Sequence, residues 1–262
     1  MRALTGKTAL VTGASSGIGE AIARKLAAEG VNLVLVARSQ DKLKQLADAL
    51  TQSYAVQCTV LLADLSTQNC GATVHGQVKA MGLTVDILVN NAGYGTYGPF
   101  DSIAPENEQA EIAVNIAAVV DFAHAFLPEM LKRGEGTILN VASTAAFQPV
   151  PYMAVYAASK AFVLSFSEAL WAEYRQQGIH VVALCPSAVD TGFINHLGDE
   201  SVRKTAAFST TLQPEQVAAH AMKAIYGKGP THITGFKNWL MAQSVRFAPR
   251  SLVARSSADM MR

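Results

Sequence analysis

A tyrosine and a lysine stand four residues apart in the segment Y-A-A-S-K, as Tyr156 and Lys160. On a helix, residues i and i+4 lie on the same face, so the phenol and the ammonium would point the same way. A phenol alone has a pKa of about 10 and transfers protons poorly at neutral pH. A nearby cation favours the phenolate and lowers that pKa. The pair therefore predicts a proton-transfer group, although the same spacing also arises where a half-buried tyrosine merely precedes a solvated lysine.

A glycine-rich turn, T-G-A-S-S-G-I-G, occupies residues 12–19, between an apolar run and a helical pattern. In that position glycines permit a tight turn and let a phosphate approach backbone N–H groups at the start of a helix. The same stretch matches G-x-S-x-G, the nucleophile elbow of hydrolases. An elbow would need an acid and a histidine at later strand ends and would normally follow a later strand. Phosphate binding is therefore the stronger interpretation, and a hydrolase stays as a minor alternative.

The composition indicates a globular chain with a large buried core. Its 262 residues suit one large α/β domain or two small ones. Half of the residues are hydrophobic and 16% are charged, which argues against disorder. The formal net charge of +1 gives no support for a nucleic-acid partner.

The cysteines and histidines bear on compartment and metal binding. Cys58, Cys70 and Cys185 form no C-x-x-C pair, so we expect free thiols in a reducing cytoplasm. The six histidines have no metal-ligand spacing, and we expect no metal site. The N-terminal segment MRALTGKTALVTG lacks the apolar region of a signal peptide, which also favours a cytoplasmic protein.

Short apolar runs alternate with longer helical patterns along the chain. Strands are expected at residues 8–12, 31–36, 55–62, 85–89, 137–141, 180–184 and 231–234. Helices are expected at residues 18–29, 40–50, 66–81, 106–132, 154–177 and 214–226. This alternation predicts an α/β fold: a single domain, 1–262, with a doubly wound, Rossmann-like parallel sheet of about seven strands flanked by helices. Residues 187–213 are expected to form a mobile substrate lid, and residues 235–262 a C-terminal tail.

Several motifs stand in the order and spacing of one enzyme family. The glycine turn is followed by Asp64, N-N-A-G at residues 90–93, Asn115, Ser143 and Tyr156-x-x-x-Lys160. Together they resemble the short-chain dehydrogenase/reductase family, and the resemblance extends to about Thr234. It implies hydride transfer between a nicotinamide cofactor and a carbonyl or alcohol carbon. The alternative is a sensor or scaffold that binds cofactor without turnover.

The resemblance also implies roles for single side chains. Tyr156 would be the general acid/base, Lys160 would lower its pKa and hold the nicotinamide ribose, and Ser143 would bond the same substrate oxygen. Asn115 would anchor a water that links Lys160 to a proton relay. The expected cofactor-binding residues are Gly13, Ser15, Ser16, Gly17, Ile18, Gly19, Arg38, Asp64, Leu65, Asn91, Ala92, Gly93, Tyr156, Lys160, Pro186, Val189 and Thr191.

Two of these positions also have a physical reason independent of the family. Ser143 ends the fifth expected strand, and strand C-termini form the ligand crevice of a doubly wound sheet. Asparagine is a poor helix former, so Asn115 inside a helix suggests a local hydrogen-bonding task. One position departs from the family, because Ser187 follows Pro186 where glycine is usual. We therefore expect the backbone to approach the nicotinamide differently there.

The second expected strand ends V-L-V-A-R-S-Q, which bears on the choice of cofactor. In NAD-binding folds an acid near this point accepts hydrogen bonds from the adenosine ribose. Here Ala37 leaves room for a 2′-phosphate, Arg38 offers a positive fork for it, and Ser39 could add a hydroxyl. The sequence therefore predicts NADP(H) in preference to NAD(H).

The substrate and partners are less clearly defined by the sequence. An apolar carbonyl or alcohol substrate is expected from the residues placed around the cleft: Tyr94, Tyr97, Phe147, Pro149, Val150, Tyr152, Phe193 and Leu197, with His196 as a possible addition. From residue 237 onward the tail has five basic residues and one acidic residue, a net charge of +4, with apolar residues between them. It could lie on a membrane surface, but packing on its own domain or a partner subunit is preferred. The resemblance implies a homodimer or homotetramer paired through helices 106–132 and 154–177.

Overall fold

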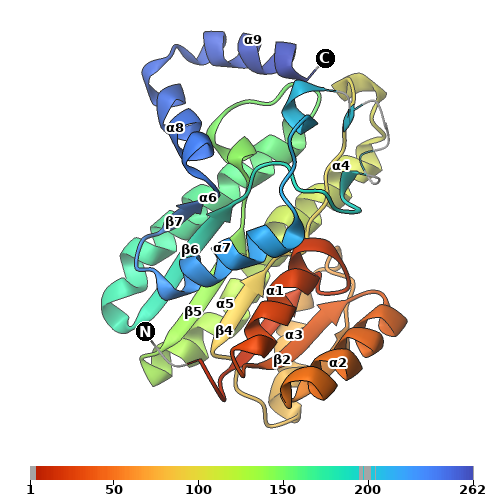
Figure 1. Cartoon of the computed structure of the whole chain (residues 1–262), viewed down its shortest axis with the longest axis vertical. Helices are drawn as coiled ribbons and strands as arrows, with labels where there is room; N and C mark the ends of the chain where they lie inside the picture. Colours follow the sequence, from red (N-terminus) through yellow and green to blue (C-terminus); the bar gives the residue numbers. More distant parts are fainter. Residues whose placement is uncertain (1–3, 195–196, 198–201, 204, 262) are drawn as a thin grey trace.

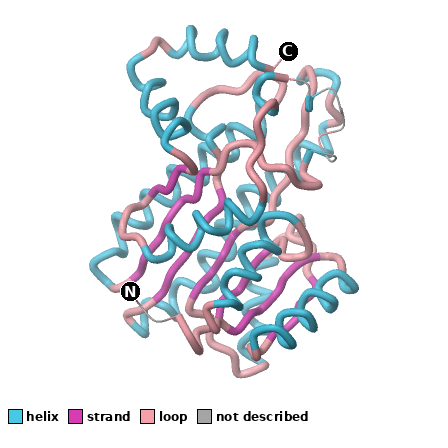
Figure 2. Tube along the Cα trace, viewed as in Figure 1, coloured by secondary structure: helices cyan, strands magenta, loops and turns pink. Residues whose placement is uncertain are grey.

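The computed structural model describes residues 4–194, 197, 202–203 and 205–261. Within them, seven strands form one sheet in the order β3-β2-β1-β4-β5-β6-β7, and every neighbouring pair is parallel. Figure 1 labels β2 and β4 to β7, and Figure 2 marks the strands in magenta. The sheet confirms the predicted doubly wound α/β fold. The strands are β1 (Thr8–Thr12), β2 (Asn32–Ala37), β3 (Cys58–Leu62), β4 (Ile87–Asn90), β5 (Gly136–Val141), β6 (Ile179–Cys185) and β7 (Thr231–Ile233).

Helices cover both faces of the sheet, and alternate strand residues supply the two cores. On β1, Ala9 and Val11 pack into one cluster with α1 (Gly17–Ala28), α2 (Gln40–Tyr54) and α7 (Pro214–Tyr226). Leu10 faces the opposite way, into a cluster with α3 (Cys70–Ala80) and α5 (Ala118–Arg133). Helix α6 (Ala154–Tyr174) covers β6 on that same face. Because both faces are buried, the central strands are continuous apolar runs, as expected for a parallel sheet.

Two predicted boundaries are wrong for local reasons. The third strand begins at Cys58 rather than residue 55, because α2 continues to Tyr54 and Ala55 caps it in the left-handed region with φ +54°. Helix α3 begins at Cys70 rather than residue 66. The Asp64 carboxylate accepts hydrogen bonds from the backbone and hydroxyl of Ser66, at 3.0 and 2.7 Å, and these bonds hold a turn instead. Short polar side chains compete with helix formation in this way.

The predicted helix 106–132 is continuous but not regular. It starts as α4 (Pro105–Ile112), passes through a π-helical turn at Ala113–Ala117, and continues as α5. The π turn contains Asn115, and such turns often occur at functional sites. The combined segment Pro105–Arg133 is long and apolar enough to cross a membrane, but α5 packs against α3 and the sheet, as a core helix does.

The C-terminal tail forms two further helices at one end of the molecule. Helix α8 (Phe236–Ser244) is followed by a short 3-10 turn and by α9 (Arg250–Met260). Figure 1 shows both, in dark blue, beyond the carboxyl end of β7 and near the start of α6. The tail therefore lies at the same end of the molecule as the strand C-termini.

The order of the strands fixes where a ligand can bind. The chain winds outward from β1 in one direction and from β4 in the other, so β1 and β4 meet at the topological switch point. Ligands of open parallel sheets bind in the crevice beyond the carboxyl ends of such strands. The glycine turn, Asn91 and Ser143 directly or closely follow β1, β4 and β5 at that edge.

Candidate active site

The turn after β1 is held tight by its glycines. Gly13 and Gly17 have φ of +65° and +58°, in the left-handed region that favours glycine. A Cβ at Gly19 would collide with the Gly13 carbonyl and the Asn91 amide. Because glycine has no side chain, the backbone N–H groups at the start of α1 are not covered at these positions. Such an N-terminus fits the phosphates of a dinucleotide.

A serine at the same helix start is also available to a phosphate. Ser16 is the N-cap residue of α1, yet within the described part of the chain its side chain makes no capping hydrogen bond. Ser16 is exposed, and Ser15 and Ile18 are half-buried in the same turn. These residues lie where the sequence placed the cofactor phosphates.

The end of β4 is tied to the glycine turn by hydrogen bonds. The Asn91 side chain donates to the Thr12 carbonyl at 2.9 Å. The backbone N–H groups of Asn91 and Ala92 both donate to the Thr12 hydroxyl, at 3.0 and 3.1 Å. Asn90 instead donates to the Asn140 side chain on β5, at 2.9 Å, and is buried. Within the N-N-A-G motif, Asn90 therefore stabilises the sheet, and Asn91 stabilises the glycine turn.

Arg38 and Asp64 lie on the same edge, at the ends of β2 and β3. Both are exposed, and Arg38 contributes to lowering the pKa of Asp64 after the larger effect of the hydrogen bonds from Ser66. The geometry places a positive and a negative side chain near the expected adenosine end of a dinucleotide. The side chain of Leu65, by contrast, is buried in the core, so only its backbone can face a cofactor.

Ser143 and Tyr156 meet at the carboxyl edge of the sheet. Ser143 begins a 3-10 turn, Thr144–Phe147, and its oxygen accepts from the Ala145 N–H at 3.1 Å. Its hydroxyl hydrogen is left to donate elsewhere. A hydrogen bond with Ser143 lowers the pKa of Tyr156, although burial has the larger, opposite effect. The structure thus brings together the two hydroxyl groups predicted to share one substrate oxygen.

The pKa of Tyr156 does not fall as the Tyr–Lys spacing predicts. Burial raises it to about 12. Lys160 lies under the ring, with its Nζ 5.7 Å from the ring centroid, and donates to the Val141 carbonyl at 2.9 Å. The ammonium therefore donates to the backbone of β5 while it lies beside the Tyr156 ring. The structure by itself does not show the lowered tyrosine pKa, because desolvation outweighs the hydrogen bond from Ser143.

Asn115 connects the π turn to the catalytic helix. Its side chain donates to the Ser159 hydroxyl at 3.0 Å and to the Tyr94 carbonyl at 2.9 Å. Its oxygen accepts from the Tyr94 N–H at 3.2 Å. A Cβ at Gly93 would lie 2.8 Å from that oxygen and 3.3 Å from Lys160 Nζ. Glycine is thus required where the loop after β4 passes over the lysine.

The loop after β6 lies across the edge of the sheet where the cofactor is expected to bind. The Pro186 carbonyl accepts from Thr144 N–H at 2.9 Å, and the Ser187 N–H donates to the Thr234 hydroxyl at 3.2 Å. Val189 is buried and pairs with Leu212 in an isolated bridge. The Thr191 methyl lies against Gly17, 3.1 Å from where a Cβ would stand. The segment therefore closes over the glycine turn, with Ser187 held by the end of β7.

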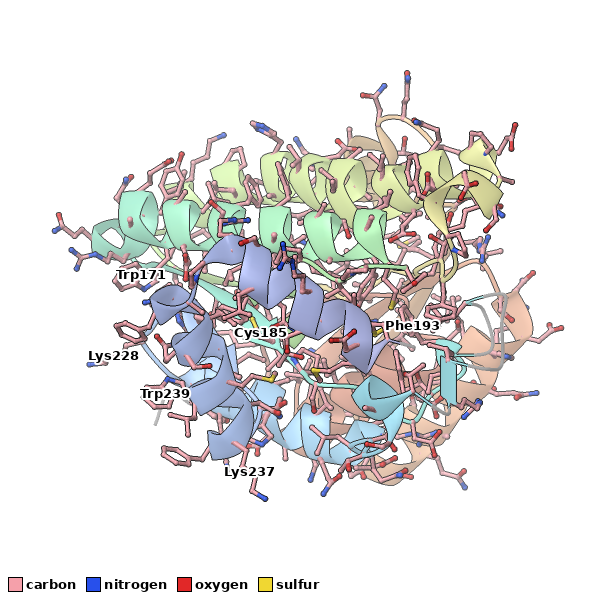
Figure 3. The ribbon with its side chains drawn as sticks, turned by 90° about the horizontal axis from the view of Figure 1, so that it is seen from above. Trp171, Cys185, Phe193, Lys228, Lys237 and Trp239 are labelled. Carbon is pink, nitrogen blue, oxygen red and sulfur yellow. The ribbon has the colours of Figure 1, made fainter. Side chains whose placement is uncertain are left out.

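An apolar cluster, called the apolar wall from here on, packs against Tyr156. It consists of the buried residues Val150, Met153, Ala157, Ile194, Leu197, Val202 and Met261, with Tyr97, Ala145, Tyr152, Phe193 and Phe208 packed against them. The ring of Phe193, labelled in Figure 3, lies 5.4 Å from that of Tyr156. The chain end is fixed here, because the Tyr97 hydroxyl donates to the Met261 carbonyl at 2.7 Å.

The wall differs in part from the cleft residues predicted from the sequence. Tyr97, Val150, Tyr152, Phe193 and Leu197 belong to it. Phe147 packs instead with the α6 and β6 residues, and the Tyr94 hydroxyl donates to the Asn107 carbonyl. Pro149 is not among the wall residues, and His196 lies outside the described residues.

Sequence reasoning missed several residues of the wall, Met261 among them, and also missed Glu111. Met261 has no motif and joins the wall only because the tail folds back. Glu111 is completely buried close to Lys160 and Tyr156. A signal for Glu111 existed, because it stands one helical turn before Asn115 and so shares its helix face.

The fold and the site together define a dinucleotide-dependent oxidoreductase. A model of the short chain dehydrogenase family matches residues 7–201. The chain belongs to that family and is an NAD(P)-dependent oxidoreductase.

Two curated relatives are similar along much of the chain. A very-long-chain 3-oxoacyl-CoA reductase from Anas platyrhynchos is 38% identical over 192 residues, covering 71% of this chain. The match spans only 61% of the length of that relative. Oxidoreductase UcpA from Salmonella typhimurium is 38% identical over 226 residues, covering 86% of this chain and 82% of the relative.

Two solved structures have the same fold and carry different cofactors. A short-chain dehydrogenase from Sphingobium yanoikuyae in complex with NADPH has a TM-score of 0.82 and 31% identity, over 92% of this chain and 94% of that chain. A short-chain dehydrogenase/reductase from Burkholderia phymatum in complex with NAD has a TM-score of 0.83 and 28% identity, over 93% of this chain and 94% of that chain.

Proposed function

We propose that this protein is an NADP(H)-dependent reductase of bulky apolar carbonyl compounds, with Tyr156 as the proton donor. The observation that carries the proposal is the position of Tyr156, between the Ser143 hydroxyl and an apolar wall. With its pKa raised to about 12, the phenol keeps its proton at neutral pH and is suited to donate it.

The residues of the site divide the work of reduction. Bound NADPH supplies the hydride to the carbonyl carbon. The hydroxyl groups of Ser143 and Tyr156 donate hydrogen bonds to the carbonyl oxygen as it gains negative charge. Tyr156 transfers its proton to that oxygen, which gives the alcohol, and the Lys160 ammonium stabilises the phenolate that remains.

The preference for NADP(H) rests on the end of β2. Arg38 is exposed there, and Ala37 offers no carboxylate that would repel a 2′-phosphate. The two solved relatives bind NADPH and NAD respectively, so similarity alone leaves the choice open. A charge-assisted hydrogen bond from Arg38 contributes roughly 1.5–3 kcal/mol, on the order of ten- to a hundredfold in affinity.

Titration of both cofactors tests this preference. Arg38→Ala is expected to weaken NADP(H) binding by about ten- to a hundredfold and to leave NAD(H) binding nearly unchanged. Lys25→Ala, which removes an exposed positive charge on α1, is the matched control and should change neither affinity. Equal or tighter binding of NAD(H) by the unmodified protein would overturn the preference.

The rival function is a cofactor sensor or scaffold without turnover. The Ser143, Tyr156 and Lys160 set is intact, and this supports an enzyme. NADPH-dependent turnover of a panel of apolar ketones separates the two functions. If cofactor binds tightly but no ketone or alcohol in the panel is converted, the sensor is the better account.

We also propose that residues 187–213, of which 195–196, 198–201 and 204 lie outside the described residues, act as a lid over the substrate. Phe193 already packs on Tyr156, and Thr191 lies against Gly17, so movement of this segment would open both halves of the site. Limited proteolysis should cut this segment more slowly when NADPH and a ketone are bound. Unchanged cleavage there would count against the lid.

A homodimer or homotetramer paired through α5 and α6 is proposed as the assembly, in a cytoplasmic location. On α6, Phe162 is 39% exposed and stacks on Phe166, which leaves an apolar surface for a partner helix. A monomer by sedimentation at micromolar concentration would contradict this assembly. The free thiols Cys58, Cys70 and Cys185 support a reducing compartment, which cell fractionation can test.

The tail has a second exposed apolar surface, which also suits a subunit contact. Phe236 and Trp239 stack at 5.7 Å and remain 75% and 46% exposed. Figure 3 shows Trp239 and Lys237 at the outer side of α8. Contact with a partner subunit is preferred over contact with a membrane. Binding to anionic vesicles that is lost on deleting residues 235–262 would reverse that preference.

A further inference from the structure

Glu111 is an ionisable side chain that the proposed mechanism leaves unused. It stands on α4 with 0% of its surface exposed. Its Oε2 accepts hydrogen bonds from the backbone N–H and hydroxyl of Thr96, at 3.0 and 3.1 Å. Its Oε1 is buried and has no hydrogen-bond partner among the described residues. A buried carboxyl oxygen left without a partner is costly and calls for an explanation.

The groups around Glu111 come from three elements. Helix α6 supplies Lys160 and Tyr156, α4 supplies Glu108, and the loop after β4 supplies Tyr94. Of these groups, Lys160 is the positive one. The only other negative charge among them is that of Glu108, which further raises the pKa of Glu111.

Lys160 needs a counter-charge, because the protein encloses it. Burial lowers its pKa to about 8, and the largest opposing effect comes from the charge of Glu111. In the described part of the chain no salt bridge joins the two residues, so the attraction acts over a longer distance. Nζ is already held by the Val141 carbonyl, which bears no net charge. Cys185 is the other group that raises the pKa of Lys160, but burial raises the pKa of that thiol to about 12, so it stays neutral over most of the accessible pH range. Glu111 is therefore the group that favours the ammonium in this poorly solvated site.

We propose that Glu111 is a positioning residue that acts through Lys160: its buried carboxylate keeps the ammonium charged and in place beside Tyr156. The inference rests on the proposed function, because the charged ammonium is what holds the nicotinamide ribose and stabilises the phenolate. Glu111 lies on the same helix face as Asn115, one turn away. Both side chains therefore support α6, the helix that carries Lys160.

Removing the carboxylate changes the ionisation of Lys160 in a defined direction. A negative neighbour favours the ammonium, so its loss lowers the pKa of Lys160 further. At pH 6 the lysine stays largely charged in both proteins, and Glu111, whose pKa burial raises to about 7, is itself largely protonated. At pH 8.5 the variant has lost more of its ammonium than the unmodified protein. The difference between the two proteins should therefore grow as the pH rises.

The test compares Glu111→Gln with the unmodified protein from pH 5.5 to 9.5, by NADPH affinity and by kcat on an apolar ketone. NADPH affinity and kcat should both fall as the pH becomes alkaline, and we expect this alkaline decline to occur about one pH unit lower in Glu111→Gln. At pH 8.5 this means NADPH binding weaker on the order of tenfold in the variant. At pH 6 the two affinities should agree within about twofold. Glu111→Asp keeps the charge and should restore most of the original profile, even if Glu111→Gln folds poorly.

Two control variants separate charge from structure. Glu108→Gln removes a neighbouring charge that does not act on Lys160, and it should leave the alkaline decline in place. Thr96→Val removes one hydrogen bond to Glu111 but keeps the carboxylate. It should also leave the alkaline decline in place. A loss of affinity in Glu111→Gln that is equal at every pH, or no loss at all, overturns the inference.

The outcomes also separate this inference from the proposed function. If the unmodified protein reduces ketones but the Glu111→Gln profiles match it, the inference fails and the function stands. If no ketone is reduced yet NADPH affinity shows the shifted decline, the function fails and the coupling of Glu111 to Lys160 stands.

Discussion

Tyr156 separates two surroundings that are built in opposite ways. Behind it lie buried polar groups, with Asn115, Ser159 and Lys160 joined by hydrogen bonds to each other or to the backbone. In front of it lies an apolar wall that includes Met153 and Met261. The polar groups determine where protons and charge can be held. The apolar wall can select a substrate only by its shape. In the proposed function, catalysis depends on the polar groups and selectivity on the apolar wall.

The two sides also differ in where their residues come from. The polar side is built on helices α4 and α6, the π turn and the end of β5, which the sheet holds in place. The apolar wall gathers the loop after β5, the start of α6, the segment after β6 and the chain end. Loops and chain ends vary more easily than a packed sheet edge. The wall is therefore the side that can adapt to another substrate while the chemistry stays the same.

The largest effect is expected from Tyr156→Phe, which removes the proton donor and keeps the ring. Activity should fall on the order of 10²–10⁴-fold, the usual size of acid–base assistance. Cofactor affinity and folding should be retained, because the phenyl ring still packs on Phe193. Steady-state kinetics measure this, and Tyr226→Phe, at an exposed hydroxyl bonded to Glu29, is the control. Near-normal turnover by Tyr156→Phe would falsify the mechanism.

The polar side should make stability depend on pH. Burial raises the pKa of Glu111 to about 7, so the folded protein binds its proton more tightly than the unfolded chain does. The contribution of Glu111 to the free energy of unfolding is complete below about pH 4 and is lost as the pH rises through 7. The loss is up to about 3 kcal/mol. Glu111→Gln should remove this decline.

Urea unfolding at pH 5 and pH 7.5 measures the effect. In the unmodified protein Lys160 does not mask the effect, because its pKa, lowered to about 8, adds stability mainly as the pH rises above that value. In Glu111→Gln, where that pKa is expected to fall further, Lys160 can add only a rise in stability with pH and never a decline. Equal slopes of stability with pH in the two proteins would show that Glu111 does not titrate in the folded state.

The tight loop over Lys160 is expected to tolerate no added methyl group. Gly93→Ala places a Cβ 2.8 Å from Asn115 Oδ1, which is held by the Tyr94 backbone. Overpacking of this kind costs about 1–3 kcal/mol. Gly76→Ala on α3, where a Cβ meets nothing within 4 Å, is the control and should gain about 1 kcal/mol. Thermal unfolding of both variants checks the contrast, and a stabilised Gly93→Ala would contradict the description of the loop.

The smallest effect is expected on the apolar wall. Met261→Ala removes a buried side chain at the chain end, where Tyr97 holds the backbone and not the side chain. The enlarged wall should favour bulkier ketones, raising the ratio of kcat/KM between a bulky and a small ketone roughly tenfold. Activity on the small ketone should change less. A ratio that does not move would place Met261 outside the substrate site.

Residues whose roles depend on local pattern could be predicted from the sequence. The strands, the glycine turn and the cluster of Ser143, Tyr156 and Lys160 follow from short motifs and from alternation along the chain. Asn115 was marked as unusual because asparagine is a poor helix former, and the structure places it in a π turn.

Residues whose roles depend on burial could not be predicted. The spacing of Tyr156 and Lys160 indicates a nearby cation but gives no measure of desolvation, which raises the tyrosine pKa instead of lowering it. Met261 reaches the wall only through the path of the whole tail. Glu111 is enclosed by Thr96 and α6, from two other parts of the chain. Such environments exist only once the chain has folded.

The most direct test of the division at Tyr156 follows a labelled hydride. NADPH carrying deuterium at C4 of the nicotinamide, on the transferred face, is mixed with the protein and a bulky apolar ketone, and the product alcohol is analysed by mass spectrometry. The account predicts one deuterium on the carbinol carbon for each NADPH oxidised, with formation slowed on the order of 10²–10⁴-fold in Tyr156→Phe. NADPH oxidation without label in the alcohol, or equal rates in the two proteins, would contradict it.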